Sequence, residues 1–173
     1  MLPQVCDLWD FFRESAVAGR VGAIKHMNIW DFQTRLTNRL LAWSALSVAF
    51  SALTVFSASP FLRGFGLQFF AWGAIDAAIA FFGAKASAKK RLKMQGQASA
   101  ESEARESRWL ENILWVNTGL DVLYVLGGVW LTQTWGADSV LWRGHGWGVI
   151  VQGGFLFFFD FFHAFTLRKL RTK

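Results

Sequence analysis

The chain is poor in the residues that build metal and redox centres. Its 173 residues include one cysteine, Cys6, and three histidines, His26, His145 and His163. One cysteine excludes an internal disulfide, a cysteine-based zinc site and a dithiol redox centre. The histidines are too few and too scattered to form a paired haem ligand set. The sequence also lacks a P-loop, an HExxH motif and a GxSxG motif. We therefore expect no enzyme, no cofactor and no metal centre.

Lysine and arginine are missing from four long apolar stretches. Hydrophobic residues make up 53% of the chain and aromatic residues 17%, well above the usual content of soluble domains. A helix needs about 20 mostly apolar residues to cross a bilayer. Four stretches qualify: 40–58, 65–83, 113–131 and 147–165. A soluble helical bundle is the alternative, but its helices would have polar outer faces. Because the second and fourth stretches are apolar nearly all round, we predict four transmembrane helices.

Nearly all the positive charge lies on one side of these four spans. Of the 18 lysines and arginines, 16 lie before the first span, between the second and third, or after the fourth. Only Arg63 and Arg143 fall on the other side. The positive-inside rule therefore places both termini in the cytoplasm of a prokaryote, with the spans in its inner membrane. The net charge of +6 is then a topology signal and a contact to anionic lipid headgroups, and we expect no nucleic-acid partner.

The segments between the spans predict the rest of the organisation. Residues 1–27 are a cytoplasmic tail rather than a signal peptide, because acidic residues interrupt any apolar core, and Met27 is an alternative start. Asn28 caps a helix over 28–39, which we interpret as interfacial and amphipathic or as a plain extension of the first span. Two hairpins follow, 40–84 and 109–168, with a basic, helix-prone linker over 85–108 and a tail over 169–173. Gly96 is the expected break in the linker.

The two hairpins resemble each other. When NRLLAWSALSVAF from Asn38 is set beside NILWVNTGLDVLY from Asn112, Ser47 matches Asp121. When RGFGLQFFAWGAI from Arg63 is set beside RGHGWGVIVQGGF from Arg143, three glycines coincide. Two spans per unit predict a parallel repeat with a pseudo-two-fold axis along the membrane normal. Two apolar hairpins align to some extent by chance, so similarity without duplication stays an alternative.

Each span has one face of small or polar residues at spacings of three and four. In lipid, such faces turn inward, where backbones approach and hydrogen bonds form. Counted from the cytoplasmic ends, Ser47, Asp76, Asp121 and Asp160 lie about 10, 10, 12 and 8 Å deep. The spacing therefore predicts a layer of acids within the bundle. The candidate binding or proton-relay residues are Ser47, Asp76, Asn117, Asp121, Tyr124, Gln152, Asp160 and His163.

Placing three acids inside the membrane carries a large free-energy cost. Each costs roughly 2.5–3.5 kcal/mol at the bilayer centre, and no lysine or arginine in the spans offsets them. They are protonated, or share protons with one another and His163, or hold a cation. The first hypothesis is therefore a membrane protein that binds or transports a proton, a small cation or a small solute. The second is a structural or accessory subunit, in a homo-oligomer or a larger membrane complex, whose polar core only sets helix register.

The strings RGFGLQFFAWGAID, NTGLDVLYVLGG and RGHGWGVIVQGG resemble a family of small prokaryotic four-span membrane proteins classed as a domain of unknown function. The resemblance covers about residues 28–168. It implies the four-span topology and nothing about activity, so no functional residue follows from it.

Overall fold

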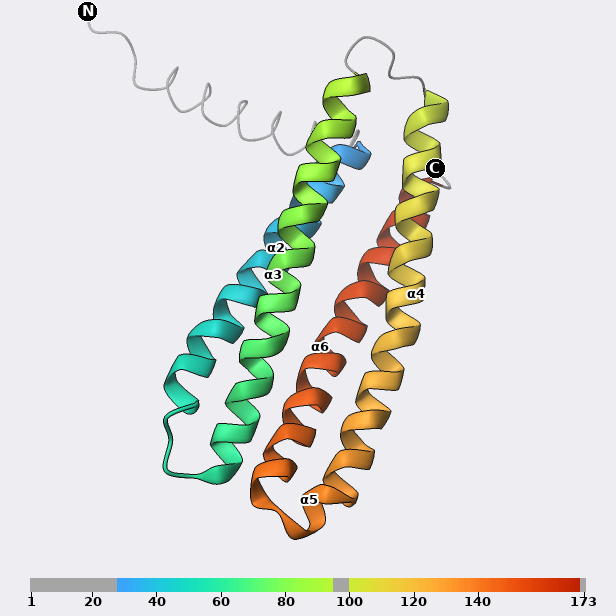
Figure 1. Cartoon of the computed structure of the whole chain (residues 1–173). Coiled ribbons are helices and arrows are strands. Elements are labelled where there is room, and N and C mark those ends of the chain that lie inside the picture. The colour runs from blue at the N-terminus through green and yellow to red at the C-terminus, as the bar shows by residue number, and fades with distance from the viewer. Residues whose placement is uncertain (1–27, 95–99, 172–173) are drawn as a thin grey trace, which may run out of the picture.

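The computed structural model describes residues 28–94 and 100–171, and they form an all-α protein, as the sequence predicts (Figure 1). The predictions for the tail over 1–27 and for a break at Gly96 lie outside the described residues. The elements are α2 (Ile29–Thr54), α3 (Pro60–Met94), α4 (Ala100–Gln133), the short α5 (Trp135–Asp138) and α6 (Val140–Arg171).

Local sequence explains where α2 and α3 begin and end. The Asn28 side chain accepts a hydrogen bond of 2.9 Å from the backbone N–H of Asp31, so the predicted cap is confirmed. α2 ends at Thr54, which leaves the last residues of the predicted span 40–58 in a turn. Pro60 then begins α3, at a position where its missing N–H costs no hydrogen bond. Most of the predicted linker is helical, because α3 continues to Met94 and α4 begins at Ala100.

Three helices in the described part of the chain are long and apolar enough to cross a membrane: Pro60–Lys93, Glu101–Gln133 and Val140–Leu170. α2 is not among them. Polar residues in its first half, among them Asn38 and Arg39, and the buried Ser44, Ser47, Ser51 and Thr54 lower its mean hydropathy, although 26 residues make a helix about 39 Å long. The structure thus confirms an all-α chain with membrane-length helices, while α2 meets the length but not the composition expected of a span.

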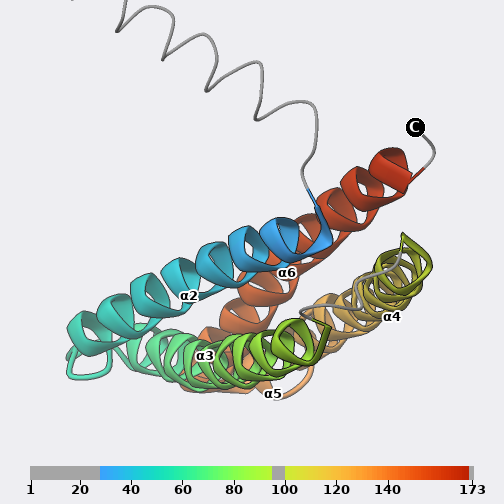
Figure 2. The ribbon, with the colours of Figure 1, turned by 90° about the horizontal axis from the view of Figure 1, so that it is seen from above.

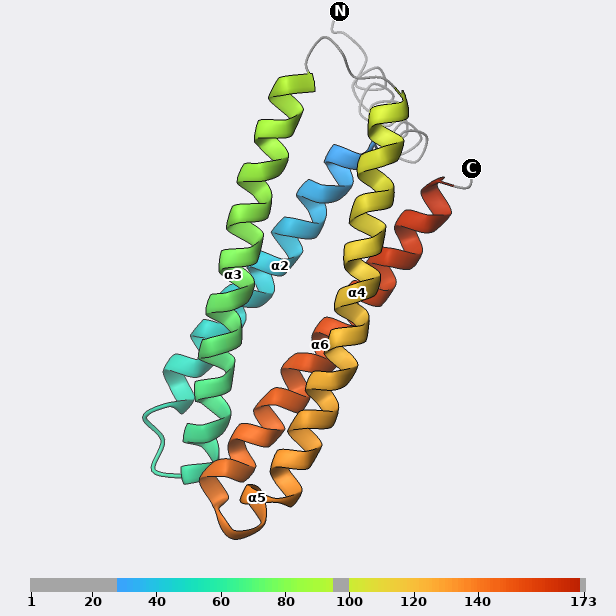
Figure 3. The same ribbon diagram turned by 45° about the vertical axis from the view of Figure 1, so that its right-hand side comes forward.

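The long helices form two antiparallel hairpins. α2 packs on α3, α4 packs on α6, and the contact between α3 and α6 joins the pairs (Figures 1 and 3). We call the end that carries Asn28, Met94, Ala100 and Arg171 the basic end, and the opposite end, with the turn 55–59 and α5, the α5 end. Seen from the basic end, α2 and α6 lie on one side, and α3 and α4 on the other (Figure 2).

Two glycines bring α3 and α6 into backbone contact near the α5 end. A Cβ atom on Gly64 would collide with the carbonyl oxygen of Leu141, and one on Gly144 would collide with that of Phe61. Each glycine therefore faces the residue three positions before the other glycine. No other residue type fits such an approach, in which small residues let helix backbones meet.

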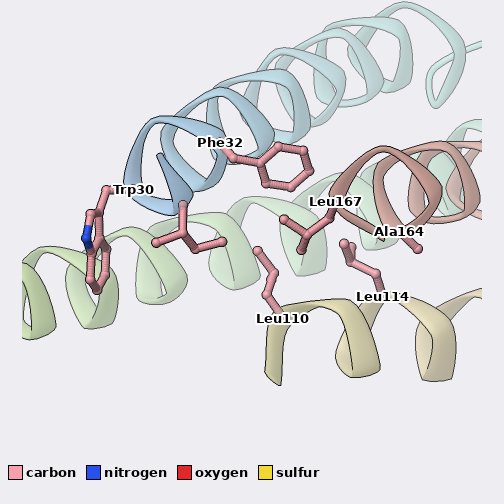
Figure 4. Packing of buried hydrophobic residues seen from close by; sticks show 7 residues of the cluster. Trp30, Phe32, Leu110, Leu114, Ala164 and Leu167 are labelled. Atoms are coloured by element: carbon pink, nitrogen blue, oxygen red, sulfur yellow. The ribbon is translucent and has the colours of Figure 1, made fainter. Parts of the chain in front are cut away.

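An apolar cluster fills the basic end (Figure 4). Its residues come from α2, α4 and α6, and they are Ile29, Trp30, Phe32, Leu110, Leu114, Ala164 and Leu167. Residues 28–39 are the first turns of a continuous α2. Their apolar side chains Ile29, Trp30 and Phe32 are buried in this cluster.

Candidate functional site

Three acids from three helices are buried together in the bundle. Asp76 on α3 is 2% exposed, Asp121 on α4 is 4% exposed and Asp160 on α6 is 8% exposed. Asp121 lies within electrostatic reach of both other carboxyl groups, and Asp76 lies within reach of Asp160. The inward orientation that the spacing predicts is thus what the structure has, and the mutual proximity of the three carboxyl groups agrees with it.

The hydrogen bonding of these acids is incomplete. Asp76 Oδ2 and Asp121 Oδ2 are buried and accept no hydrogen bond within the described part of the chain. Asp160 is different, because the side-chain amide of Asn117 donates to it. A buried polar atom without a partner costs about 1–3 kcal/mol. Two such atoms, on carboxyl groups within electrostatic reach of each other, are therefore the kind of feature that a bound proton, ion or solute would explain.

Several other buried polar residues of the bundle have hydrogen-bond partners. Gln152 is fully buried, accepts a hydrogen bond of 2.9 Å from Trp43 Nε1 and donates one of 3.1 Å to Ser47 Oγ. The Trp43 ring stacks on Phe155, with centroids 3.6 Å apart. Three hydroxyl groups bond to carbonyls of their own helices: those of Ser44, Thr54 and Thr118. Ser47 and Gln152 thus belong to a closed network that joins α2 to α6, and Trp43 completes it.

A cavity of about 240 Å³ reaches Asp160 from the direction of the basic end. Asp160, Asn117 and Phe159 line its inner part, and the walls above them are mainly aliphatic, with Leu36, Leu40, Ile79, Ala80, Gly83, Ile113 and Leu114. Lys90 and Glu106 line the other end, which we call the mouth. Since Glu106 precedes Asn117 by eleven residues of α4, the cavity follows the helices for about 16 Å.

Polar side chains line the mouth and bond to one another. Both carboxylate oxygens of Glu106 lie 2.9 Å from Lys90 Nζ, and Gln33 Nε2 donates to Glu106 Oε1 at 3.2 Å. Ser87 donates to Gln33, and Lys90 lies 4.3 Å from the ring centroid of Trp109. This network ties α2, α3 and α4 together. Sequence reasoning missed it, because charges in a mixed-sign linker give no signal that separates a partner from solvent.

Two candidates from the sequence make their contacts elsewhere. His163 Nδ1 donates to the Phe159 carbonyl at 2.6 Å, so Nε2 accepts from Arg39 at 3.0 Å. Both ring nitrogens are therefore engaged outside the acid layer. Tyr124 is 41% exposed and packs edge-on against Trp72, with centroids 4.7 Å apart. Tyr124 thus lies at the bundle surface, although it shares a helical stripe with Asp121.

Within residues 28–94 and 100–171, no group of three or more His, Cys, Asp or Glu side chains is arranged to hold a metal ion. The fold and the buried groups define a helical protein of membrane type with an acidic layer in its interior. The chain belongs to the family of unknown function DUF6992, whose model matches residues 39–161. That range holds all three acids but not His163. No curated protein and no solved structure matches the chain.

Proposed function

We propose that this chain is a four-span protein of a prokaryotic cytoplasmic membrane, with both termini inside. In this proposal Asp76, Asp121 and Asp160 bind a proton in the bundle and exchange it with the cytoplasm through the cavity. The lipid bilayer is the partner that the surface requires.

The surface of α2 supports its assignment as the fourth span. Its hydroxyl face is buried, while Leu53 is 81% exposed and Leu46 is 65% exposed on the other side. α3, α4 and α6 likewise expose many large apolar side chains along their length. Monomeric soluble proteins rarely expose apolar patches of this extent, so acyl chains are the surroundings that suit all four helices.

The packing of the hairpins supports the internal repeat. Gly66 on α3 packs against Thr54 on α2, and Gly146 on α6 packs against Gly128 on α4. These positions correspond in the alignment of the two halves: Gly66 with Gly146, and Thr54 with Gly128. Gly64 and Gly144 also correspond, and their contacts across α3 and α6 are reciprocal. A pseudo-two-fold axis between α3 and α6 relates contacts of this kind.

The unpartnered buried oxygens of Asp76 and Asp121 are the observation that carries the proposed role. Residues that only fix helix register are satisfied in this bundle, as Ser47 and Gln152 are. An acid that served the same purpose would have acquired a donor, because lipid supplies none. Asp121 is within electrostatic reach of both other carboxyl groups, so we take it as the central group of the proposed relay.

A flux assay in proteoliposomes tests this role. The purified chain is reconstituted with a pH-sensitive dye inside, and proton uptake is driven by a potassium diffusion potential. We expect Asp121→Asn to remove the flux and to leave folding intact. Asp138→Asn is the matched control, because Asp138 is exposed on α5. Equal flux in Asp121→Asn and the unaltered chain, or no flux above empty vesicles, would reject the relay.

A structural subunit is the second candidate, and the closed Trp43–Gln152–Ser47 network favours it. In this role the bundle is a scaffold whose apolar surface docks on a second copy of the chain or on a larger complex. Purification in mild detergent separates the two roles. A stoichiometric partner protein, with proton flux absent in its presence and absence, supports the scaffold.

A further inference from the structure

The cavity that ends at Asp160 has a charge pattern that favours one class of ligand. Its charged lining residues are Asp160, Lys90 and Glu106. Lys90 and Glu106 neutralise each other in an ion pair at the mouth. The remaining charge is the carboxyl group of Asp160, which is 8% exposed and lies beside Asn117. The inner part of the cavity is therefore suited to a positive group and unsuited to an anion.

The walls add a second requirement. Between the mouth and Asp160 the cavity is bounded by aliphatic side chains, with the aromatic rings of Phe159 and Trp109 at different levels. A hydrated inorganic cation gains nothing from such walls. A ligand with a cationic head and an apolar body matches both parts, because its body removes apolar surface from water while its head pairs with the carboxylate.

The volume limits the size of the ligand. A cavity of about 240 Å³ exceeds the roughly 150 Å³ that encloses benzene and is smaller than the roughly 300 Å³ at which pockets for drug-sized molecules begin. One ring with a short chain, or an alkyl chain of similar volume, fits this space.

We infer that the cavity binds a small hydrophobic monoamine, with its ammonium group at Asp160 and Asn117 and its apolar part along α3 and α4. The inference deepens the proposed function and rests on it in one respect, namely that Asp160 releases a proton. A bound ammonium group would then take the place of that proton. The ligand would enter past the Lys90–Glu106 pair, whose side chains join α3 to α4 across the mouth.

Binding is tested on the full chain in proteoliposomes with radiolabelled 2-phenylethylamine, against 2-phenylethanol as the neutral analogue of equal size. Asp160→Asn removes the charge and keeps the shape of the side chain. Gly83→Leu fills the cavity, because Gly83 lines it and a Cβ there meets nothing within 4 Å. Gly119→Leu is the matched control, since Gly119 has the same open surroundings on α4 and does not line the cavity.

We expect saturable binding of the amine and none of the alcohol. Asp160→Asn should weaken binding by about thirtyfold or more, the usual effect of removing one partner of a buried charge pair. Gly83→Leu should abolish binding, and Gly119→Leu should leave it within about twofold. Equal binding of the alcohol, or unchanged binding in Gly83→Leu, would overturn the inference.

The Asp121-dependent proton flux, measured on the same vesicles, separates this failure from failure of the proposed function. Flux without amine binding rejects only the ligand. Asp160-dependent amine binding without flux supports the ligand and rejects the relay.

Discussion

Trp43 on α2 donates its indole N–H to the side-chain oxygen of Gln152 on α6 at 2.9 Å, inside a bundle where α2 and α6 are far apart in sequence. Gln152 passes the interaction on to Ser47, so one amide joins two side chains of α2 at spacing i, i+4. The rows of small residues bring the helices together, and this network fixes their register along the axis.

Trp43→Phe should therefore destabilise the fold, because it removes the N–H donor and keeps an aromatic ring to stack on Phe155. Hydrogen bonds between membrane helices contribute about 0.6 kcal/mol on average and up to about 1.7 kcal/mol. We expect a loss of unfolding free energy in that range, measured by steric trapping in bicelles. Trp147→Phe, at a residue 47% exposed, is the control and should be neutral. An equal loss in both variants would mean that ring size, not the hydrogen bond, matters.

The close approach of α3 and α6 gives a second prediction. Gly64→Ala places a Cβ atom where the Leu141 carbonyl lies, so the helices must move apart. Overpacking of this kind costs about 1–3 kcal/mol. Gly119→Ala, in open space on α4, should instead be neutral or stabilise by up to about 1 kcal/mol, because alanine favours the helix. Thermal unfolding in mild detergent compares the two, and equal melting temperatures would contradict the crossing.

Sequence periodicity predicted which residues face inward, but not which residues of other helices they contact. Spacings of three and four placed Asp121 and Asp160 on inward faces and Asp76 beside such a face, and the structure has all three in the interior. The stripe that carries Asp121 also included Tyr124. Tyr124 lies at the surface, because a helix face defined by four or more residues spans a wide arc. Partners on other helices depend on tilt and rotamer, which periodicity does not contain.

The Trp43–Gln152 bond and the Lys90–Glu106 pair show this limit most clearly. Trp43 lies one turn before Ser47, so its helix face was available from the sequence, yet tryptophan in an apolar stretch usually signals packing alone. For His163 the sequence suggested a partner that the structure does not have. His163 lies one turn from Asp160, but its Nε2 accepts a hydrogen bond from Arg39 on α2.

The topology of α2 is the subject of a third prediction, since its hydropathy alone does not mark it as a span. In a Cys6→Ser background, a cysteine at exposed Thr34 should react with a membrane-impermeant maleimide only after the membrane is permeabilised. A cysteine at exposed Ala58 should react in intact cells. If both cysteines react from outside, α2 does not cross the membrane and the four-span proposal fails.

The last prediction concerns the cost of the acid layer. A buried carboxyl group with an unpartnered oxygen lowers the stability of the fold, and replacing it with an apolar group removes that cost. Asp76→Leu should therefore raise the unfolding free energy by up to about 2 kcal/mol while it abolishes proton flux, the exchange of stability for activity that functional sites often show. Gln152→Leu, at a position with both hydrogen bonds made, should lower stability instead, because it leaves the Trp43 indole N–H without an acceptor and removes the hydrogen bond that Gln152 donates to Ser47. Steric trapping on both variants gives the signs. If Asp76→Leu destabilises as much as Gln152→Leu does, then Asp76 is part of the helix packing and its free oxygen carries no functional meaning.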